Sequence, residues 1–280
     1  MDAVTSLDAV CGVLARLAPL SLAESWDNVG LLVGDRRASV GRIMTCLTIT
    51  PNVVDEAVKE RADLVITHHP LPFQPLSRIT SDTITGSMLL QLIANGVAVY
   101  SAHTAFDSAA EGINQSWGDL LGLVDLSPLV EWEDAKDAET SVKGDPEPTP
   151  AVVGSGRYGQ LSSPQLLGQL VRQAAAAVDA SCPRLVGDPD RRVRTVALAC
   201  GSGGSFLAAA ARHGCDVMIT GEATFHTCLE AESRGIGLGL LGHYFSERFA
   251  MERLAATIGQ EFADIAIWPS RSERDPLTPL

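Results

Sequence analysis

Two consecutive histidines, His68 and His69, follow the largely apolar run 63–67 and directly precede Pro70. The run is typical of a buried strand, and the proline prevents a simple continuation of that strand. Both imidazoles are therefore expected at the C-terminal edge of a sheet, where open α/β folds bind their ligands. Imidazole is the commonest protein ligand for metals and titrates near neutral pH. The pair is thus a candidate for metal binding or for acid–base chemistry.

Two further histidines occur in segments of similar design. Each follows an apolar stretch, 97–100 or 238–241, and each precedes a carboxylate by four residues. The first pair is His103 and Asp107, and the second is His243 and Glu247. Residues four apart share one face of a helix, so each pair can bind one ion if a helix begins at its histidine. For His103 and Asp107 the sequence is equally compatible with a loop.

Four imidazoles and two carboxylates exceed the needs of one tetrahedral ion. They suit two ions about 3.5–4 Å apart, with a carboxylate as a bridge. Two carboxylates ~4 Å apart repel each other by about 4 kcal/mol at an effective dielectric of 20, and divalent cations remove that repulsion. A divalent ion also lowers the pKa of a coordinated water towards ~7. Mixed nitrogen and oxygen ligation fits iron, manganese, zinc, cobalt or nickel and does not distinguish among them.

Each of these histidine features, taken alone, also has an ordinary structural explanation without a metal. A His-His pair at a strand end is commonly one hydrogen-bonded and one exposed histidine. A histidine and a glutamate four apart on a helix are commonly a solvated pair. Their joint occurrence at equivalent strand ends is what favours a metal site.

Two other features are candidates for chemistry. His226, just beyond Glu222, could contact substrate or exchange protons, or it could be a surface helix histidine. The loop Gly201–Ser205 could bind an anion through its amides, or it could be a tight turn capped by Ser205. The loop has neither the G-x-G-x-x-G spacing nor a Walker lysine. No binding site for an organic cofactor is therefore predicted.

The chain repeats itself. The stretches 43–67 and 196–220 align without a gap, and each is read as strand, helix, strand. This order implies parallel pairing through a right-handed crossover. The fold class expected is α/β, with two internally similar lobes of mostly parallel sheets around a dinuclear metal cleft.

Four regions follow from these patterns. They are a first α/β lobe, 1–130; an acidic loop with a connecting strand and helix, 131–192; a second α/β lobe, 193–269; and a C-terminal tail, 270–280, expected to fray. Within the connecting region, Ser163 is expected to cap a helix over 166–178 with Pro164 in its first turn.

The composition excludes several classes of protein. The net charge of −13 on 280 residues argues against binding of polymeric nucleic acid, although one nucleotide could still bind through a metal. No stretch approaches the ~20 apolar residues of a membrane span. The N-terminus carries Asp2 and no basic region, which argues against a secretory signal. None of the six cysteines forms a C-x-x-C pair, so a reducing cytoplasm is expected.

Several segments together resemble the YbgI-type, NIF-three-like dinuclear metal-binding proteins, whose members are often called GTP cyclohydrolase type 2 homologues. The resemblance runs from Ala23 to about Pro269 and rests on segments 24–31, 66–70, 101–107, 154–158, 201–206, 219–222 and 242–247. The chain lacks the long domain that some members insert after the first lobe.

The resemblance implies a metal site, an assembly and an activity. It implies that two divalent ions (iron, manganese or zinc) are bound by His68, His69, Asp107, His243 and Glu247, with His103 beside them. It also implies a toroidal homohexamer. The function expected is hydrolysis of a small molecule, such as a nucleotide, by metal-activated water, with His103 or His226 moving protons. The alternative left open is a non-catalytic regulatory or interaction scaffold that binds metal.

Overall fold

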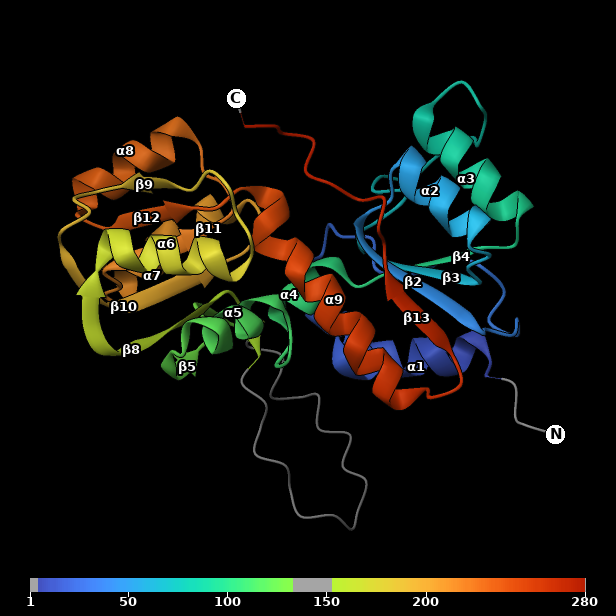
Figure 1. The fold of residues 1–280 in the computed structure, drawn as a ribbon, viewed down its shortest axis with the longest axis horizontal. Coiled ribbons are helices and arrows are strands. Elements are labelled where there is room, and N and C mark those ends of the chain that lie inside the picture. Colours follow the sequence, from blue (N-terminus) through green and yellow to red (C-terminus); the bar gives the residue numbers. More distant parts are fainter. Residues whose placement is uncertain (1–4, 133–152, 280) are drawn as a thin grey trace, which may run out of the picture. The chain divides into compact units, whose positions relative to one another are not determined.

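The computed structural model describes residues 5–132 and 153–279. The chain divides into two compact units, one made of Met1–Phe106 with Glu247–Thr278 and the other of Asp107–Ser246. Each unit is a sheet with helices on both faces (Figure 1). Within the described residues, no helix combines the length and the apolar character needed to cross a membrane.

The first unit contains a five-stranded sheet. From one edge to the other, the strands are β1 (Gly30–Val33), β4 (Ala98–Ser101), β3 (Leu64–His69), β2 (Arg42–Thr48) and β13 (Ala266–Pro269). Only β1 runs antiparallel to its neighbour. One face is covered by α2 (Pro51–Lys59) and α3 (Ile84–Ala94), the other by α1 (Leu7–Leu17) and by the part of α9 (His243–Glu261) that belongs to this unit (Figure 1).

Side-chain alternation along β2 explains how both faces of the first sheet are covered. Met44 and Cys46 are fully buried and pack with the apolar residues of α2 and α3. Thr45 points to the other face, where its Oγ1 donates to the Met251 carbonyl of α9 at 2.8 Å. A strand covered on both faces is buried along its length, and residues 43–47 of β2 are all buried.

The second unit contains a six-stranded sheet. The strands in spatial order are β5 (Val124–Ser127), β8 (Arg157–Leu166), β10 (Arg192–Ala199), β11 (Val217–Thr220), β12 (Gly237–Leu240) and β9 (Arg184–Val186). The central β10, β11 and β12 are parallel, and the outer strands are antiparallel. One face packs against α7 (Leu207–Arg212) and α8 (Phe225–Arg234), the other against α5 (Ile113–Leu121) and α6 (Leu167–Ala177). A short ribbon pairs β6 (Val130–Glu131) with β7 (Gly154–Ser155).

The predicted duplication is confirmed down to strand register. Ile43 pairs with Leu64 in the first unit, and the aligned residues Val196 and Val217 pair in the second. Both copies also use an aspartate in the same way: Asp63 Oδ2 accepts the backbone N–H groups of residues 41 and 42 at 2.8 and 2.9 Å. The equivalent bonds, from residues 194 and 195 to Asp216 Oδ2, are 2.8 and 2.9 Å long.

The structure corrects the predicted boundaries. Residues 107–130, expected in a first lobe 1–130, belong to the second unit. The strand and helix expected to connect the lobes correspond to β8 and α6, and both are part of the second unit. Strand β13 lies beside β2 in the first sheet, not in a lobe spanning 193–269. The reason is that α9 acts as a crossover that returns the chain to its first sheet, and nothing local in the sequence encodes that return.

The start of α6 also differs from expectation. Ser163 and Pro164 lie within β8, and the helix begins only at Leu167. The pairing of β8 with β10 is irregular here, passing from Gln165↔Val193 to Gln160↔Thr195. Such an interruption of the ladder tolerates a proline, which has no N–H to donate.

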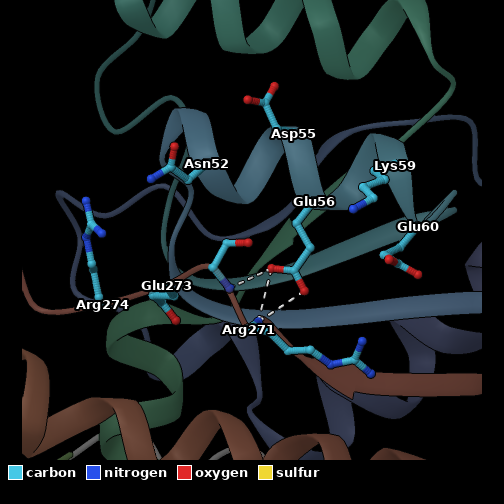
Figure 2. Close-up of a pocket in the computed structure, with 9 residues that line it drawn as sticks. Asn52, Asp55, Glu56, Lys59, Glu60, Arg271, Glu273 and Arg274 are labelled. Carbon is cyan, nitrogen blue, oxygen red and sulfur yellow. Dashed lines mark hydrogen bonds between the residues drawn. The ribbon is translucent and has the colours of Figure 1, made fainter.

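The C-terminal segment is held in place over residues 270–273 rather than frayed. The buried Glu56 carboxylate of α2 accepts from Ser270 Oγ at 2.8 Å and from the backbone N–H of Ser272 at 2.9 Å. It also accepts from the backbone N–H of Arg271 at 3.0 Å (Figure 2). Burial raises the pKa of Glu56, but these donors outweigh burial and bring the pKa below its ordinary value of 4.5.

We expect Glu56→Gln to lower the stability of the protein by about 2 kcal/mol at pH 7, because a charged acceptor of several bonds is replaced. Because folding lowers the pKa of Glu56, its ionised carboxylate contributes its full stabilisation above pH 4.5. This stabilisation is lost as the pH falls through the lowered pKa of the folded protein. The difference in thermal midpoint between the variant and the wild type should therefore narrow below pH 4.5. Glu60→Gln, at a side chain 37% exposed, is the control and should change little. A pH-independent difference would contradict this account.

A second prediction concerns Gly214, which follows the C-terminus of α7 with φ +66°. An added Cβ would meet nothing within 4 Å, so the backbone conformation alone decides the effect. Gly214→Ala should destabilise the protein by about 1 kcal/mol. Gly12→Ala, in the middle of α1 and equally open around its Cβ, should have the opposite sign because alanine favours helix. Thermal unfolding of both variants checks the pair, and equal shifts would refute the argument.

Candidate metal centre

Three histidines of the first unit gather at the C-terminal edge of its sheet. His68 and His69 are the last residues of β3, and His103 begins α4 (His103–Ser108) just after β4. Their ring centroids are 5.0, 5.1 and 5.5 Å apart. Each ring offers a nitrogen, and the three nitrogens lie within 4.8 Å of one another. We call these three residues the histidine cluster.

The backbone of His103 is in an unusual conformation. Its φ is +24°, in the left-handed region that residues other than glycine rarely adopt. Strain of this kind persists where surrounding bonds impose it, and it concentrates at functional sites. Here it turns the chain from β4 into α4 within two residues and brings the imidazole back over the sheet edge.

A carboxylate of α9 completes the group in the first unit. The buried Glu247 places Oε2 at 3.2 Å from His69 Nε2 and Oε1 at 3.8 Å from His68 Nε2. A carboxylate facing two imidazoles with almost no solvent is an arrangement that a divalent cation stabilises, because the cation takes both kinds of ligand.

Hydrogen bonds orient two of the imidazoles. A 2.6 Å bond joins Thr48 Oγ1 to His69 Nδ1, and His103 Nδ1 donates to Asp27 Oδ1 at 2.7 Å. Metal-binding histidines typically have such a partner on one ring nitrogen, which fixes the tautomer and directs the other nitrogen to the metal. The donor set and its orientation therefore fit a metal ion.

Asp27 is an ionised carboxylate that accepts hydrogen bonds from His103 and Thr104. Its Oδ2 accepts from Thr104 Oγ1 at 2.5 Å and from the Thr104 N–H at 3.1 Å. Burial by itself raises the pKa of Asp27, but the hydrogen bonds from His103 and Thr104 outweigh it and lower the pKa to about 2. The carboxylate is thus charged near neutral pH and favours a proton on His103 Nδ1.

The C-terminal segment stabilises the histidine cluster indirectly, through the end of β2. The carboxylate of Glu273, 3% exposed, accepts the backbone N–H groups of Leu47 and Thr48 at 2.9 and 2.6 Å and contacts Arg248 Nε at 2.7 Å. Burial raises the pKa of Glu273, and these donors oppose the rise. The carboxylate fixes the end of β2, and with it the Thr48 hydroxyl that contacts His69.

A surface cavity of about 570 Å³ adjoins the same segment. It is lined by cations and carboxylates together, including Lys59, Arg271 and Arg274 with Asp55, Glu56 and Glu60. Figure 2 shows Arg271 and Arg274 directed to opposite sides of the segment. Because the charges are mixed and the two guanidinium groups diverge, the cavity is not built to hold a single anion.

The second unit holds two other predicted ligands. Asp107 Oδ1 accepts from Cys200 Sγ at 3.1 Å. His243, the first residue of α9, donates from Nδ1 to Glu222 Oε1 at 2.9 Å, and that oxygen also accepts from Ser202 Oγ at 2.7 Å. His243 therefore has the same kind of Nδ1 partner as His103. Both histidines begin a helix, which for His103 decides between the helix and the loop that the sequence left open.

The predicted residues fall into three groups. His68, His69, His103 and Glu247 come together in the first unit. Asp107 and His243 belong to the second unit, and their joining the ligand set stays a prediction. His226 lies exposed in the first turn of α8, edge-on to Phe225, and its role in proton transfer also stays a prediction.

Sequence reasoning missed the residues that orient the ligands. Asp27 lies in the Trp26-Asp27-Asn28 stretch that contributed to the resemblance, but it was given no role. Glu222 was noted only as a neighbour of His226 and as part of segment 219–222 of the resemblance. Thr48 and Glu273 gave no signal, because their contact joins positions 225 residues apart.

Two similar α/β units, one of which brings three imidazoles and a carboxylate together at a sheet edge, define a candidate metal-binding protein. Its sequence places it more narrowly: residues 5–276 match the model of Duf34/NIF3 (NGG1p interacting factor 3), and the chain belongs to this family.

Relatives and solved structures agree with this assignment. A protein of Clostridium acetobutylicum named GTP cyclohydrolase 1 type 2 homolog is 36% identical over 239 residues, which are 85% of this chain and 84% of the relative. NIF3-like protein 1 of Drosophila melanogaster is 30% identical over 97% of this chain and 88% of its own. The crystal structure of a Bacillus cereus protein related to NIF3 superposes with a TM-score of 0.88 at 22% identity and covers all of both chains.

We expect Thr48→Val, which removes one hydroxyl at nearly constant volume, to weaken metal affinity about 10- to 100-fold, as loss of an orienting partner does. Competition for Zn²⁺ against a chromophoric chelator measures the affinity. Thr80→Val, at a half-buried threonine whose hydroxyl donates to Asp82, is the matched control. Unchanged affinity in Thr48→Val would show that the hydroxyl does not orient His69.

Proposed function

We propose that this protein is a metal-dependent hydrolase that acts on a small molecule. The observation that carries the proposal is the group of three imidazoles and one carboxylate, of which His68 and Glu247 are buried, with Nδ1 of the other two imidazoles held by Thr48 and Asp27. A bound divalent ion would supply Lewis-acid chemistry, polarising the substrate and making water acidic enough to react near neutral pH.

The proposed site contains two ions of iron, manganese or zinc. Its ligands are His68, His69, Asp107, His243 and Glu247, of which the first two and the last lie in the first unit. The names of the relatives support a nucleotide as the substrate, because several of them are called GTP cyclohydrolase 1 type 2 homologs. We include in the proposal a cytoplasmic homohexamer of toroidal form.

His103 is the proposed proton carrier. Its Nδ1 donates to the ionised Asp27, so a positive charge on the imidazole is stabilised and Nε2 can accept a proton and return it. This is the role of an orienting carboxylate behind a catalytic histidine: it fixes the tautomer and compensates the charge that forms. His226, exposed on α8, is the second proposed carrier.

Elemental analysis of protein purified without chelator or affinity metal tests the metal site. We expect close to two equivalents of transition metal per chain. Glu247→Gln and Asp107→Asn should each lose at least half of that metal, because an amide is a weaker ligand than a carboxylate. Glu261→Gln, on the same helix and 47% exposed, and Asp119→Asn, exposed on α5, are the matched controls and should keep it. Full metal content in both ligand variants would refute the ligand set.

Hydrolysis assays on a panel of purine and pyrimidine nucleotides test the activity. Turnover that disappears with the metal and in Asp107→Asn supports the hydrolase. Metal at full occupancy without turnover on any substrate of the panel would instead favour the interaction scaffold. Turnover by metal-free protein would exclude the proposed chemistry.

A further inference from the structure

Two aromatic side chains stand beside the histidine cluster with much of their surface in solvent. Trp26 is 57% exposed and Phe73 is 47% exposed. Their ring centroids lie 6.0 Å apart, and they are 6.0 and 6.1 Å from the imidazole centroid of His103. Large apolar side chains that remain exposed next to a polar site commonly mark a place where a ligand binds.

The two rings are positioned by the contacts that position the cluster. Trp26 precedes Asp27, which holds His103, and Phe73 follows His69 by four residues. A hydrogen bond of 2.8 Å from Asn28 Nδ2 to the Pro72 carbonyl ties the two segments together. The same segments therefore hold the two rings and the candidate ligands, and the rings do not form a separate patch.

The geometry of the rings suits a flat ligand. Trp26 and Phe73 are inclined at 48° to each other, so neither covers the face of the other. Both meet the His103 ring nearly edge-on, at 76°. A third planar ring can stack on one aromatic face while its edge meets the other, and it then lies next to His103.

The size of the surface favours a small molecule over a protein. Two half-exposed rings offer about 200 Å² of apolar surface. A stable protein interface needs about 800 Å² from each partner. A single heteroaromatic ring, by contrast, buries its faces on one or two side chains of this kind.

We propose that Trp26 and Phe73 bind the planar heteroaromatic ring of the substrate, such as a nucleobase, beside His103. The inference deepens the proposed hydrolase function and rests on it, because it names the substrate class of that site. Stacking tolerates different bases, so the surface selects for a ring and leaves its identity to other contacts. The reacting part of the molecule is then next to the imidazole that Asp27 orients.

Binding of guanosine to the metal-loaded protein tests the proposal, with ribose as the probe that lacks a ring. Saturation-transfer NMR and titration should show contact of the base with the wild type and none for ribose. Trp26→Ala and Phe73→Ala should each weaken binding by at least tenfold, as loss of one stacking partner does. Trp26→Phe keeps a ring and should retain most of the affinity.

The control and the metal content separate this inference from the proposed function. Phe225→Ala removes a more exposed ring, 72% accessible, from α8 of the second unit and should leave guanosine binding unchanged. Trp26→Ala should keep its metal, whereas Glu247→Gln should lose it. Metal retained with no guanosine binding, or binding unaffected by both alanine variants, overturns the inference alone. Changed oligomeric state in Trp26→Ala with unchanged guanosine affinity would assign the rings to an interface between copies and also overturn it.

Discussion

The structure depends on one electrostatic constraint, which is that imidazoles and carboxylates gather at the end of a sheet where most of their surface is removed from solvent. Imidazoles and carboxylates are costly to bury unless each has a partner. In the first unit the partners are supplied in layers: Thr48 and Asp27 hold the imidazoles, Thr104 holds Asp27, and Glu273 holds the end of β2. The sheet, the helix starts and the C-terminal segment can be understood as the means of keeping these groups at hydrogen-bonding distance.

The two copies of the repeat use one scaffold for different purposes. His68 and His69 stand where the second copy has Gly221 and Glu222. In the second unit a Cβ at Gly221 would lie 2.5 Å from Ser246 Oγ and 2.6 Å from the Gly201 carbonyl, so only glycine fits. Glu222 then orients His243. The same strand end thus provides candidate ligands in one copy and the orienting partner of a candidate ligand in the other.

Much of the fold and part of the site could be predicted from the sequence, for identifiable reasons. The repeated strands were visible because buried parallel strands are largely apolar. The ungapped alignment of the two copies agrees with their equal registers, Ile43 with Leu64 and Val196 with Val217. His68 and His69 were found because they come at the end of an apolar strand, and His103 because it follows another. Glu247 was found because it lies four residues after His243. The return of β13 to the first sheet, and the bonds of Thr48 and Glu273, could not be predicted, since they join segments that no local pattern relates. Pro164 within β8 misled because a proline near a serine more often starts a helix.

The chain passes from the first unit to the second within α4 and returns within α9, and the return has a consequence for biogenesis. All residues of the second unit's sheet are consecutive along the chain, from β5 to β12, so this unit can complete its core while the polypeptide is still being synthesised. The first unit cannot be completed until its β13 edge strand and the carboxylate of Glu273 are synthesised, and both follow the second unit's sheet along the chain. Chain order therefore allows the second unit to be complete before the first, although the first unit's initial strands are translated earlier.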